Sequence, residues 1–140
     1  MTAPANDDGA PAAGERARGK LLVVDDEQQL RRLLARSLSR AGYEVSEAKD
    51  GREALALARQ TRFDLVISDV HMPELTGLEL LQALHDYDPD LPVALLSGSF
   101  DDSALQRARA LGAVACLGKP VAFQDLHSIA ARAIPSAARR

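Results

Sequence analysis

The chain is poor in cysteine and in aromatic residues. Its 140 residues include one cysteine, no tryptophan and only 4% aromatics. A single cysteine cannot form an internal disulfide, and no group of cysteine and histidine residues has the spacing of a zinc site. No apolar run approaches the roughly 20 residues of a membrane-spanning helix, and the N-terminus lacks the apolar segment of a signal peptide. We therefore expect a cytoplasmic protein with no membrane partner.

The chain also lacks an excess of basic residues. It has 17 Lys and Arg residues against 20 Asp and Glu residues, and thus a formal net charge of −3. Because nucleic-acid binding generally requires a basic surface, we expect no direct nucleic-acid partner. The 46% of hydrophobic residues is typical of a globular protein, and the length allows a single domain.

Apolar residues are missing from both ends. Apart from Met1, residues 1–18 contain no large apolar residue (Val, Ile, Leu, Met or an aromatic) and are rich in Ala, Pro and Gly. Residues 135–140 are similar. Segments of this composition bury too little apolar surface to offset the entropy lost on ordering. We predict a disordered tail over 1–18, a folded domain over 19–134, and a C-terminal tail or the start of a linker over 135–140.

Short apolar runs alternate with segments of helical periodicity. Runs typical of strands lie at 21–24, 45–48, 65–67, 92–96 and 113–117, and apolar residues at helical spacing occupy 30–41, 54–58, 78–84, 105–111 and 123–130. A strand, helix, strand order at this spacing favours parallel strands with right-handed crossovers. We predict an α/β fold, namely a flavodoxin-like doubly wound sheet of five parallel strands in the order 2-1-3-4-5, flanked by five helices in one domain.

Polar side chains follow four of these expected strands. They are Asp25, Asp26 and Glu27 after the first, Asp69 after the third, Ser97 after the fourth and Lys119 after the fifth. Each Asp taken singly could be an ordinary helix N-cap. In a doubly wound sheet, however, the carboxyl ends of the strands share one edge, where ligands bind. We therefore expect the carboxylates of the three aspartates, a hydroxyl and an ammonium group to converge there.

The expected cluster suits a metal ion and a phosphoryl group. Two carboxylates about 5 Å apart repel by roughly 3 kcal/mol at an effective dielectric of about 20, so cations must compensate. Lys119 supplies one charge, and a set of oxygen ligands favours Mg²⁺. A carboxylate can attack phosphorus, and phosphoryl transfer needs mainly positioning and charge neutralisation. Asp69 is the best candidate nucleophile, the Asp25 and Asp26 pair suits the metal, and Ser97 could donate a hydrogen bond to the phosphoryl group.

These motifs together resemble the receiver domains of two-component response regulators, over about residues 20–133. The matching segments are Val23-Val24-Asp25-Asp26-Glu27, Asp69-Val70-His71-Met72-Pro73 with Gly77, Leu96-Ser97-Gly98, and Gly112-Ala113 followed by Lys119-Pro120. Each dipeptide occurs often on its own. In this order, each after its own expected strand, the set is specific.

The resemblance implies a role for each site residue. Asp69 would accept a phosphoryl group from the phosphohistidine of a sensor histidine kinase or phosphotransfer protein. Mg²⁺ would be held by Asp26 directly, by Asp25 through water, by Asp69 and by the backbone carbonyl of His71. Ser97 and Lys119 would contact the phosphoryl group, and the Lys119-Pro120 bond would be cis.

The resemblance also implies a mode of signalling. Phosphorylation would shift a two-state equilibrium and change the surface of the fourth helix, fifth strand and fifth helix, where a downstream protein or output domain binds. Such a domain promotes only its own phosphorylation and dephosphorylation, so we do not expect an enzyme. The chain would be a single-domain regulator or the N-terminal part of a longer protein.

Four arginines of the first helix are expected on its solvated side: Arg31, Arg32, Arg36 and Arg40.

One position departs from the family pattern and keeps an alternative open. The family usually has Tyr or Phe three positions before the lysine, where this chain has Cys116. Phe100, just past the fourth expected strand, is the nearest aromatic residue that could take part of that role. The chain could therefore be a pseudo-receiver, a protein-interaction module that acts without phosphorylation. A third class, the dehalogenase-type phosphatases, places Asp-x-Asp on its first strand and adds a cap domain, for which this chain has no room.

Overall fold

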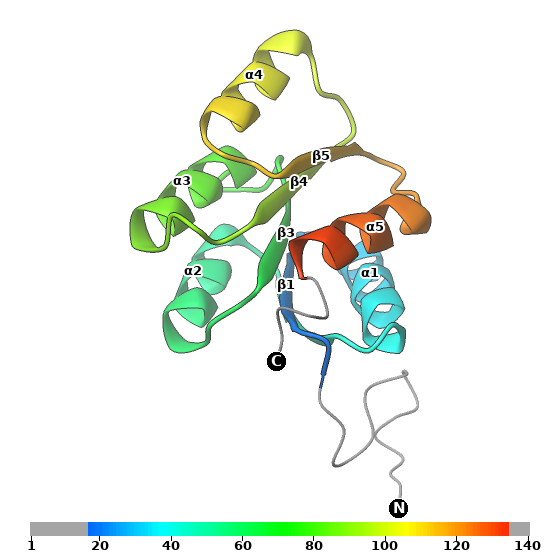
Figure 1. The fold of residues 1–140 in the computed structure, drawn as a ribbon. Helices are drawn as coiled ribbons and strands as arrows, with labels where there is room; N and C mark the ends of the chain where they lie inside the picture. Colours follow the sequence, from blue (N-terminus) through cyan, green and yellow to red (C-terminus); the bar gives the residue numbers. More distant parts are fainter. Residues whose placement is uncertain (1–16, 135–140) are drawn as a thin grey trace, which may run out of the picture.

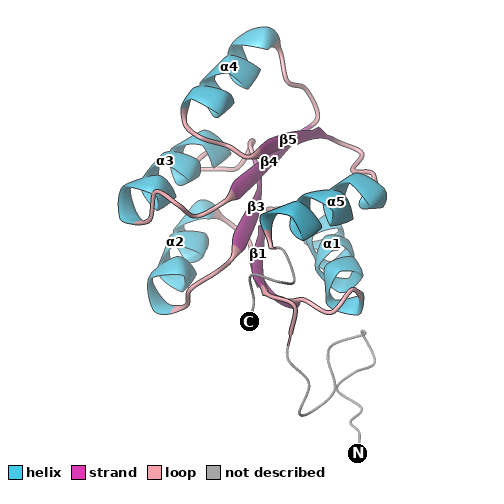
Figure 2. Cartoon of the chain, in the orientation of Figure 1, coloured by secondary structure: helices cyan, strands magenta, loops and turns pink. Residues whose placement is uncertain are grey.

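The fold was analysed in a computed structural model, which describes residues 17–134. Strands and helices alternate through this range (Figures 1 and 2). The strands are β1 (Lys20–Val24), β2 (Glu44–Ala48), β3 (Leu65–Asp69), β4 (Val93–Ser97) and β5 (Ala115–Gly118). The helices are α1 (Gln28–Arg40), α2 (Gly51–Gln60), α3 (Gly77–Tyr87), α4 (Asp102–Ala110) and α5 (Phe123–Ala133).

The five strands form one parallel sheet in the order β2-β1-β3-β4-β5, which confirms the predicted fold. Strands β3 and β4 are buried along their whole length, and β1 is buried after its first residue, as continuous apolar runs require. One core cluster packs α1 and α5 against one face of the sheet, and a second packs α2, α3 and α4 against the other. The sheet is therefore the middle layer of three (Figure 1).

Two of the strands start later than the sequence predicts. Strand β4 starts at Val93 because Pro92 has no N–H, although the Pro92 carbonyl still accepts a hydrogen bond of 3.0 Å from Val66 N. Strand β5 starts at Ala115 because Ala113 N donates to Ala108 O at 2.9 Å, which keeps Ala113 in the turn that ends α4. The sequence pattern could not separate these residues because all of them are apolar.

The predicted tails lie almost entirely outside the described residues. Within the described part, Arg18 donates to Ala41 O at 3.0 Å and lies 4.8 Å from the centre of the Tyr43 ring. No helix in residues 17–134 is long and apolar enough to cross a membrane.

The start of α3 is held close to the end of β3. The Thr76 hydroxyl accepts from Glu79 N at 3.2 Å, and the Glu79 carboxylate accepts from Thr76 N at 2.9 Å, which forms a capping box. Gly77 N donates to Val70 O at 2.8 Å, and a Cβ atom on Gly77 would overlap the backbone carbonyl oxygen of Asp69. Glycine at this position therefore allows the approach that fixes the chain around Asp69.

Candidate functional site

The carboxylates of Asp25, Asp26 and Asp69 meet at the carboxyl edge of the sheet. One oxygen from each lies within 4.8 Å of the others. Asp69 is the last residue of β3, and Asp25 directly follows β1, the neighbouring strand. Asp25 is fully buried and Asp69 is 4% exposed, whereas Asp26 is exposed. The sheet order thus brings together the carboxylates that the sequence predicted at this edge.

Lys119 joins these acidic residues from the end of β5. Its Nζ lies 3.0 Å from Asp25 Oδ2, 3.2 Å from Asp69 Oδ2 and 3.3 Å from Glu27 Oε1. The peptide bond between Lys119 and Pro120 is cis, as the family resemblance implied. The Lys119 side chain is only 17% exposed, so water screens its ion pairs with Asp25 and Asp69 less than it screens pairs on the surface.

Burial and neighbouring charges shift the pKa values of two site residues. Burial raises the pKa of the Asp69 carboxyl, the charge of Asp25 raises it further, and the His71 N–H and Lys119 oppose this. Burial alone would lower the pKa of Lys119, but hydrogen bonds and charges from Asp25 and Asp69 outweigh it, and the pKa is raised. The site therefore holds a cationic lysine beside a carboxylate that is costly to ionise.

The hydrogen bonds in the site leave one carboxylate without a protein partner. Asp25 Oδ1 accepts from Glu27 N at 2.9 Å, and Asp69 Oδ1 accepts from His71 N at 3.2 Å. Among residues 17–134, nothing donates a hydrogen bond to the Asp26 carboxylate or pairs with it. An exposed carboxylate beside two buried ones offers oxygen ligands of the kind that Mg²⁺ takes. The donor set thus fits a divalent metal ion.

Ser97 lies at the end of β4, and its hydroxyl makes hydrogen bonds to the backbone of Ser99. Ser97 Oγ donates to Ser99 O at 2.9 Å and accepts from Ser99 N at 3.1 Å, so it closes the turn after the strand. Phe100 and Cys116 are partly buried and pack against the same core cluster. The position at which the resemblance implies an aromatic residue is therefore occupied by the small side chain of Cys116, which packs against that cluster.

Two contacts of the site were missed by the sequence analysis. Glu27 follows β1 as expected but was not counted as a site residue, and its carboxylate pairs with Lys119. Arg31 was predicted on the solvated side of the first helix, and this is wrong, because its side chain is only 13% exposed. Its spacing of three and seven residues from the buried Leu34 and Leu38 was the available signal.

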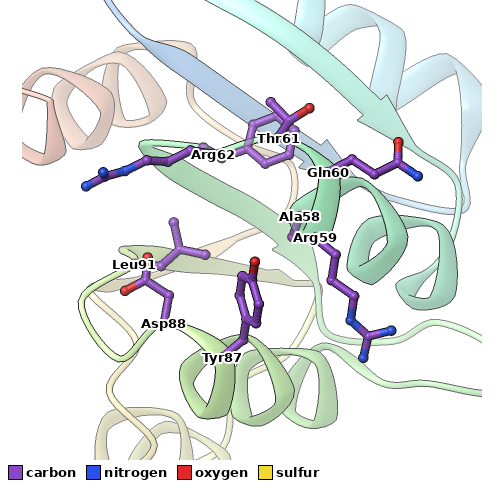
Figure 3. Close-up of a pocket in the computed structure, with 9 residues that line it drawn as sticks. Ala58, Arg59, Gln60, Thr61, Arg62, Tyr87, Asp88 and Leu91 are labelled. Carbon is purple, nitrogen blue, oxygen red and sulfur yellow. The ribbon is translucent and has the colours of Figure 1, made fainter.

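A separate cavity of about 570 Å³ lies at the opposite edge of the sheet (Figure 3). It is lined by the end of α2, the following loop and the end of α3, with Tyr87 62% exposed beside it. The side chains of Arg59 and Arg62 extend in different directions from it (Figure 3). The cavity contains none of the clustered carboxylates, and it is distinct from the candidate site.

Comparison with known sequences identifies the family. The family model for the response regulator receiver domain matches residues 21–131. A response regulator receiver protein of Anaeromyxobacter sp. (strain Fw109-5) is 43% identical over 103 residues, which are 74% of this chain and 43% of that protein. The response regulator MprA of Mycolicibacterium vanbaalenii is 45% identical over 109 residues, which are 76% of this chain and 46% of that protein. This chain thus spans less than half the length of these curated relatives.

Solved structures agree with this result. The chemotaxis protein CheY4 of Vibrio cholerae superposes with a TM-score of 0.78 and 38% identity, covering 82% of this chain and 98% of that one. The receiver domain of NtrX from Brucella abortus gives a TM-score of 0.77 and 35% identity, covering 81% and 97%. The chain belongs to the response regulator receiver domain family, and the resemblance carried by its motifs is confirmed.

Proposed function

We propose that this domain accepts a phosphoryl group on Asp69, in a reaction that depends on Mg²⁺, and that it thereby regulates a partner protein or an output domain. The donor would be the phosphohistidine of a sensor histidine kinase or a phosphotransfer protein. The observation that carries the proposal is the position of Asp69, whose Oδ2 lies 3.2 Å from Lys119 Nζ and whose carboxylate shares a 4.8 Å cluster with Asp25 and Asp26.

The acidic cluster is the proposed metal site. Asp26 and Asp69 would hold Mg²⁺ directly, Asp25 through water, and the backbone carbonyl of His71 would complete the protein's share of the ligands. Bound Mg²⁺ supplies positive charge against the oxygens of the phosphoryl group. The net charge of the carboxylate cluster makes this addition favourable, because Lys119 alone cannot balance Asp25, Asp26 and Asp69.

The reacting bonds involve Asp69 and the donor. An Asp69 oxygen would form the new bond to phosphorus as the bond from phosphorus to the donor imidazole nitrogen breaks, and that nitrogen keeps the electron pair and takes up a proton. Lys119 would neutralise charge on the transferred group. The Ser97 hydroxyl would exchange its bond to Ser99 O for one to a phosphoryl oxygen, by a rotation about its Cα–Cβ bond.

The proposed signal follows from that exchange. Release of Ser99 by Ser97 would loosen the turn that leads from β4 to α4. A partner or output domain would then bind at the surface formed by α4, β5 and α5. The domain would promote only its own phosphorylation and dephosphorylation, so it would not be an enzyme acting on separate substrates.

Acetyl phosphate with Mg²⁺, followed by intact mass measurement, tests the proposal. We expect the wild type to gain one phosphoryl group and Asp69→Asn to gain none, because only Asp69 combines nucleophile and metal cluster. Asp86→Asn, an exposed carboxylate on α3, is the matched control and should react like the wild type. If the wild type gains no phosphoryl group from acetyl phosphate or from a panel of phosphohistidine donors, the result would favour a pseudo-receiver, the alternative that Cys116 left open.

A further inference from the structure

Arg31 connects β2 to the loop that carries the acidic pair. Its Nε donates to Glu47 Oε1 on β2 at 2.9 Å, and its Nη1 donates to the backbone carbonyl of Asp25 at 2.9 Å. The side chain is 13% exposed, whereas Arg32, Arg36 and Arg40 on the same helix are exposed. The rigid fork of a guanidinium group can satisfy two acceptors with fixed directions, which a lysine ammonium cannot reproduce.

The contact fixes the peptide unit that joins Asp25 to Asp26. On its N-terminal side, Asp25 N donates to Ala48 O of β2 at 3.1 Å, and on its C-terminal side the Asp25 carbonyl accepts from Arg31. The orientation of this peptide sets the direction in which Asp26 leaves the backbone. Because no described residue donates a hydrogen bond to the Asp26 carboxylate or forms an ion pair with it, the backbone is the main constraint that holds one of its oxygens within 4.8 Å of oxygens of Asp25 and Asp69.

We propose that Arg31, anchored by Glu47, is a positioning residue for the divalent cation: it orients the Asp25–Asp26 peptide so that the Asp26 carboxylate is ready to bind the ion. The inference rests on the proposed function, since it assumes that the acidic cluster binds Mg²⁺. Groups that orient metal ligands from outside the coordination shell commonly change metal affinity by about 10-fold to 100-fold when they are removed.

The sign of the effect separates positioning from simple electrostatics. Arg31 is a cation near a cation site, so if its charge were all that mattered, neutralising it would strengthen Mg²⁺ binding. If it orients Asp26, its loss weakens binding in spite of the favourable charge change. Arg31→Lys keeps the charge and loses the fork, so electrostatics predicts no change and positioning predicts weaker binding.

The experiment is a Mg²⁺ titration of the full chain, followed by the backbone amide signals of Asp26 and Glu27. We expect both Arg31→Gln and Arg31→Lys to weaken Mg²⁺ binding by about 10-fold. Arg32→Gln removes one positive charge from the neighbouring exposed position and is the matched control. It should leave the affinity unchanged or slightly increased.

The pair with Glu47 supplies a second test. Arg31→Gln combined with Glu47→Gln restores the net charge of the wild type, so electrostatics predicts wild-type affinity for the double variant. Positioning predicts that the double variant binds as weakly as Arg31→Gln, because the two residues act as one unit. Urea unfolding without metal reports whether each variant is folded. If Arg31→Gln does not fold, Arg31→Lys keeps the test valid, because it loses the fork without changing the charge.

The outcomes separate the inference from the proposed function. A wild type that binds Mg²⁺, together with Arg31 variants that bind as tightly or more tightly, would overturn the role of Arg31 alone. A wild type that does not bind Mg²⁺ would overturn the metal site and with it this inference. Weaker binding in both Arg31 variants and in the double variant, with the control unaffected, would support it.

Discussion

At the residue scale, the surroundings of Asp69 have opposing effects on the pKa of its carboxyl group. The side chain is 6% exposed and lies close to the buried Asp25, and both conditions favour the protonated form. Lys119 and the His71 N–H favour the ionised form, but the pKa of Asp69 is still raised. The folded protein without metal therefore carries a carboxylate whose ionisation costs stability, a common arrangement at functional sites.

Asp69→Asn should stabilise the metal-free protein at neutral pH. Because the folded-state pKa of Asp69 is raised above 3.8, the folded state binds more protons than the unfolded state just above that pH, and stability falls as pH rises through this window. The asparagine variant lacks this loss, so it should be more stable than the wild type at pH 7. Urea unfolding in chelator at about pH 4 and about pH 7 measures the difference.

The stability gained by Asp69→Asn should be small at the acidic pH of this experiment and larger at neutral pH. Lys119 does not obscure it, because a raised lysine pKa contributes stability that is present below 10.5 and is lost only as pH rises above that value. A variant less stable than the wild type at pH 7 would contradict the prediction and would mean that the contact with Lys119 outweighs burial.

At the element scale, the position of each carboxylate depends on how a helix meets the end of a strand. The N-terminus of α3 packs against the end of β3 through Gly77, whose backbone N–H bonds to Val70 O. An added methyl group at Gly77 would meet Asp69 O and also Val70 Cα, at 2.7 Å. Both are backbone atoms, so neither can move without displacing the strand end and Asp69 with it.

Gly77→Ala should therefore destabilise the protein, although alanine is the better helix former by about 1 kcal/mol. Overlap with backbone outweighs that gain, and we expect a net loss of about 3 kcal/mol by urea unfolding. Gly98→Ala is the control, since nothing lies within 4 Å of its added methyl group, and its effect should stay within about 0.5 kcal/mol. Equal stabilities for the two variants would show that α3 can shift away from β3 without cost.

At the scale of the whole molecule, the site joins the ends of strands that are far apart in the sequence. Lys119 and Asp25 are separated by 94 positions in the chain, yet their side chains form a largely buried ion pair. The same ammonium group contacts the end of β3 through Asp69. One side chain thus links the ends of β1, β3 and β5, and removing it leaves two buried carboxylates without a cation.

Lys119→Met should lower the stability of the metal-free protein by about 3 kcal/mol, the usual cost of removing one partner of a buried pair. Mg²⁺ should restore more stability to this variant than to the wild type, because the ion then supplies the missing charge. Unfolding in urea with chelator and with Mg²⁺ measures both effects. Lys49→Met removes an exposed lysine and should change neither. A variant as stable as the wild type in chelator would refute the argument.

The order of apolar runs and helical segments was enough to predict the sheet and its carboxyl edge, because strand burial and crossover handedness depend on local pattern and chain connectivity. That order placed Asp25, Asp69 and Lys119 together, as the fold requires. The partners of individual side chains were not predictable in this way. Ser97 turns to Ser99, and His85 contacts the carbonyls of Leu91 and Leu111 at 2.8 Å and 3.0 Å.

Arg31 is the clearest example of the difference between pattern and packing. Its residue type favours a solvated position, but its place on the helix faces β2, where Glu47 and the Asp25 carbonyl accept its hydrogen bonds. One acceptor lies on β2 and the other in the loop that precedes α1. Both come within hydrogen-bond distance of Arg31 only after α1 has packed on the sheet. Local periodicity by itself determines which segments form helices or strands and which face of each is buried. The hydrogen-bond partners of a side chain depend on contacts that form only in the folded protein.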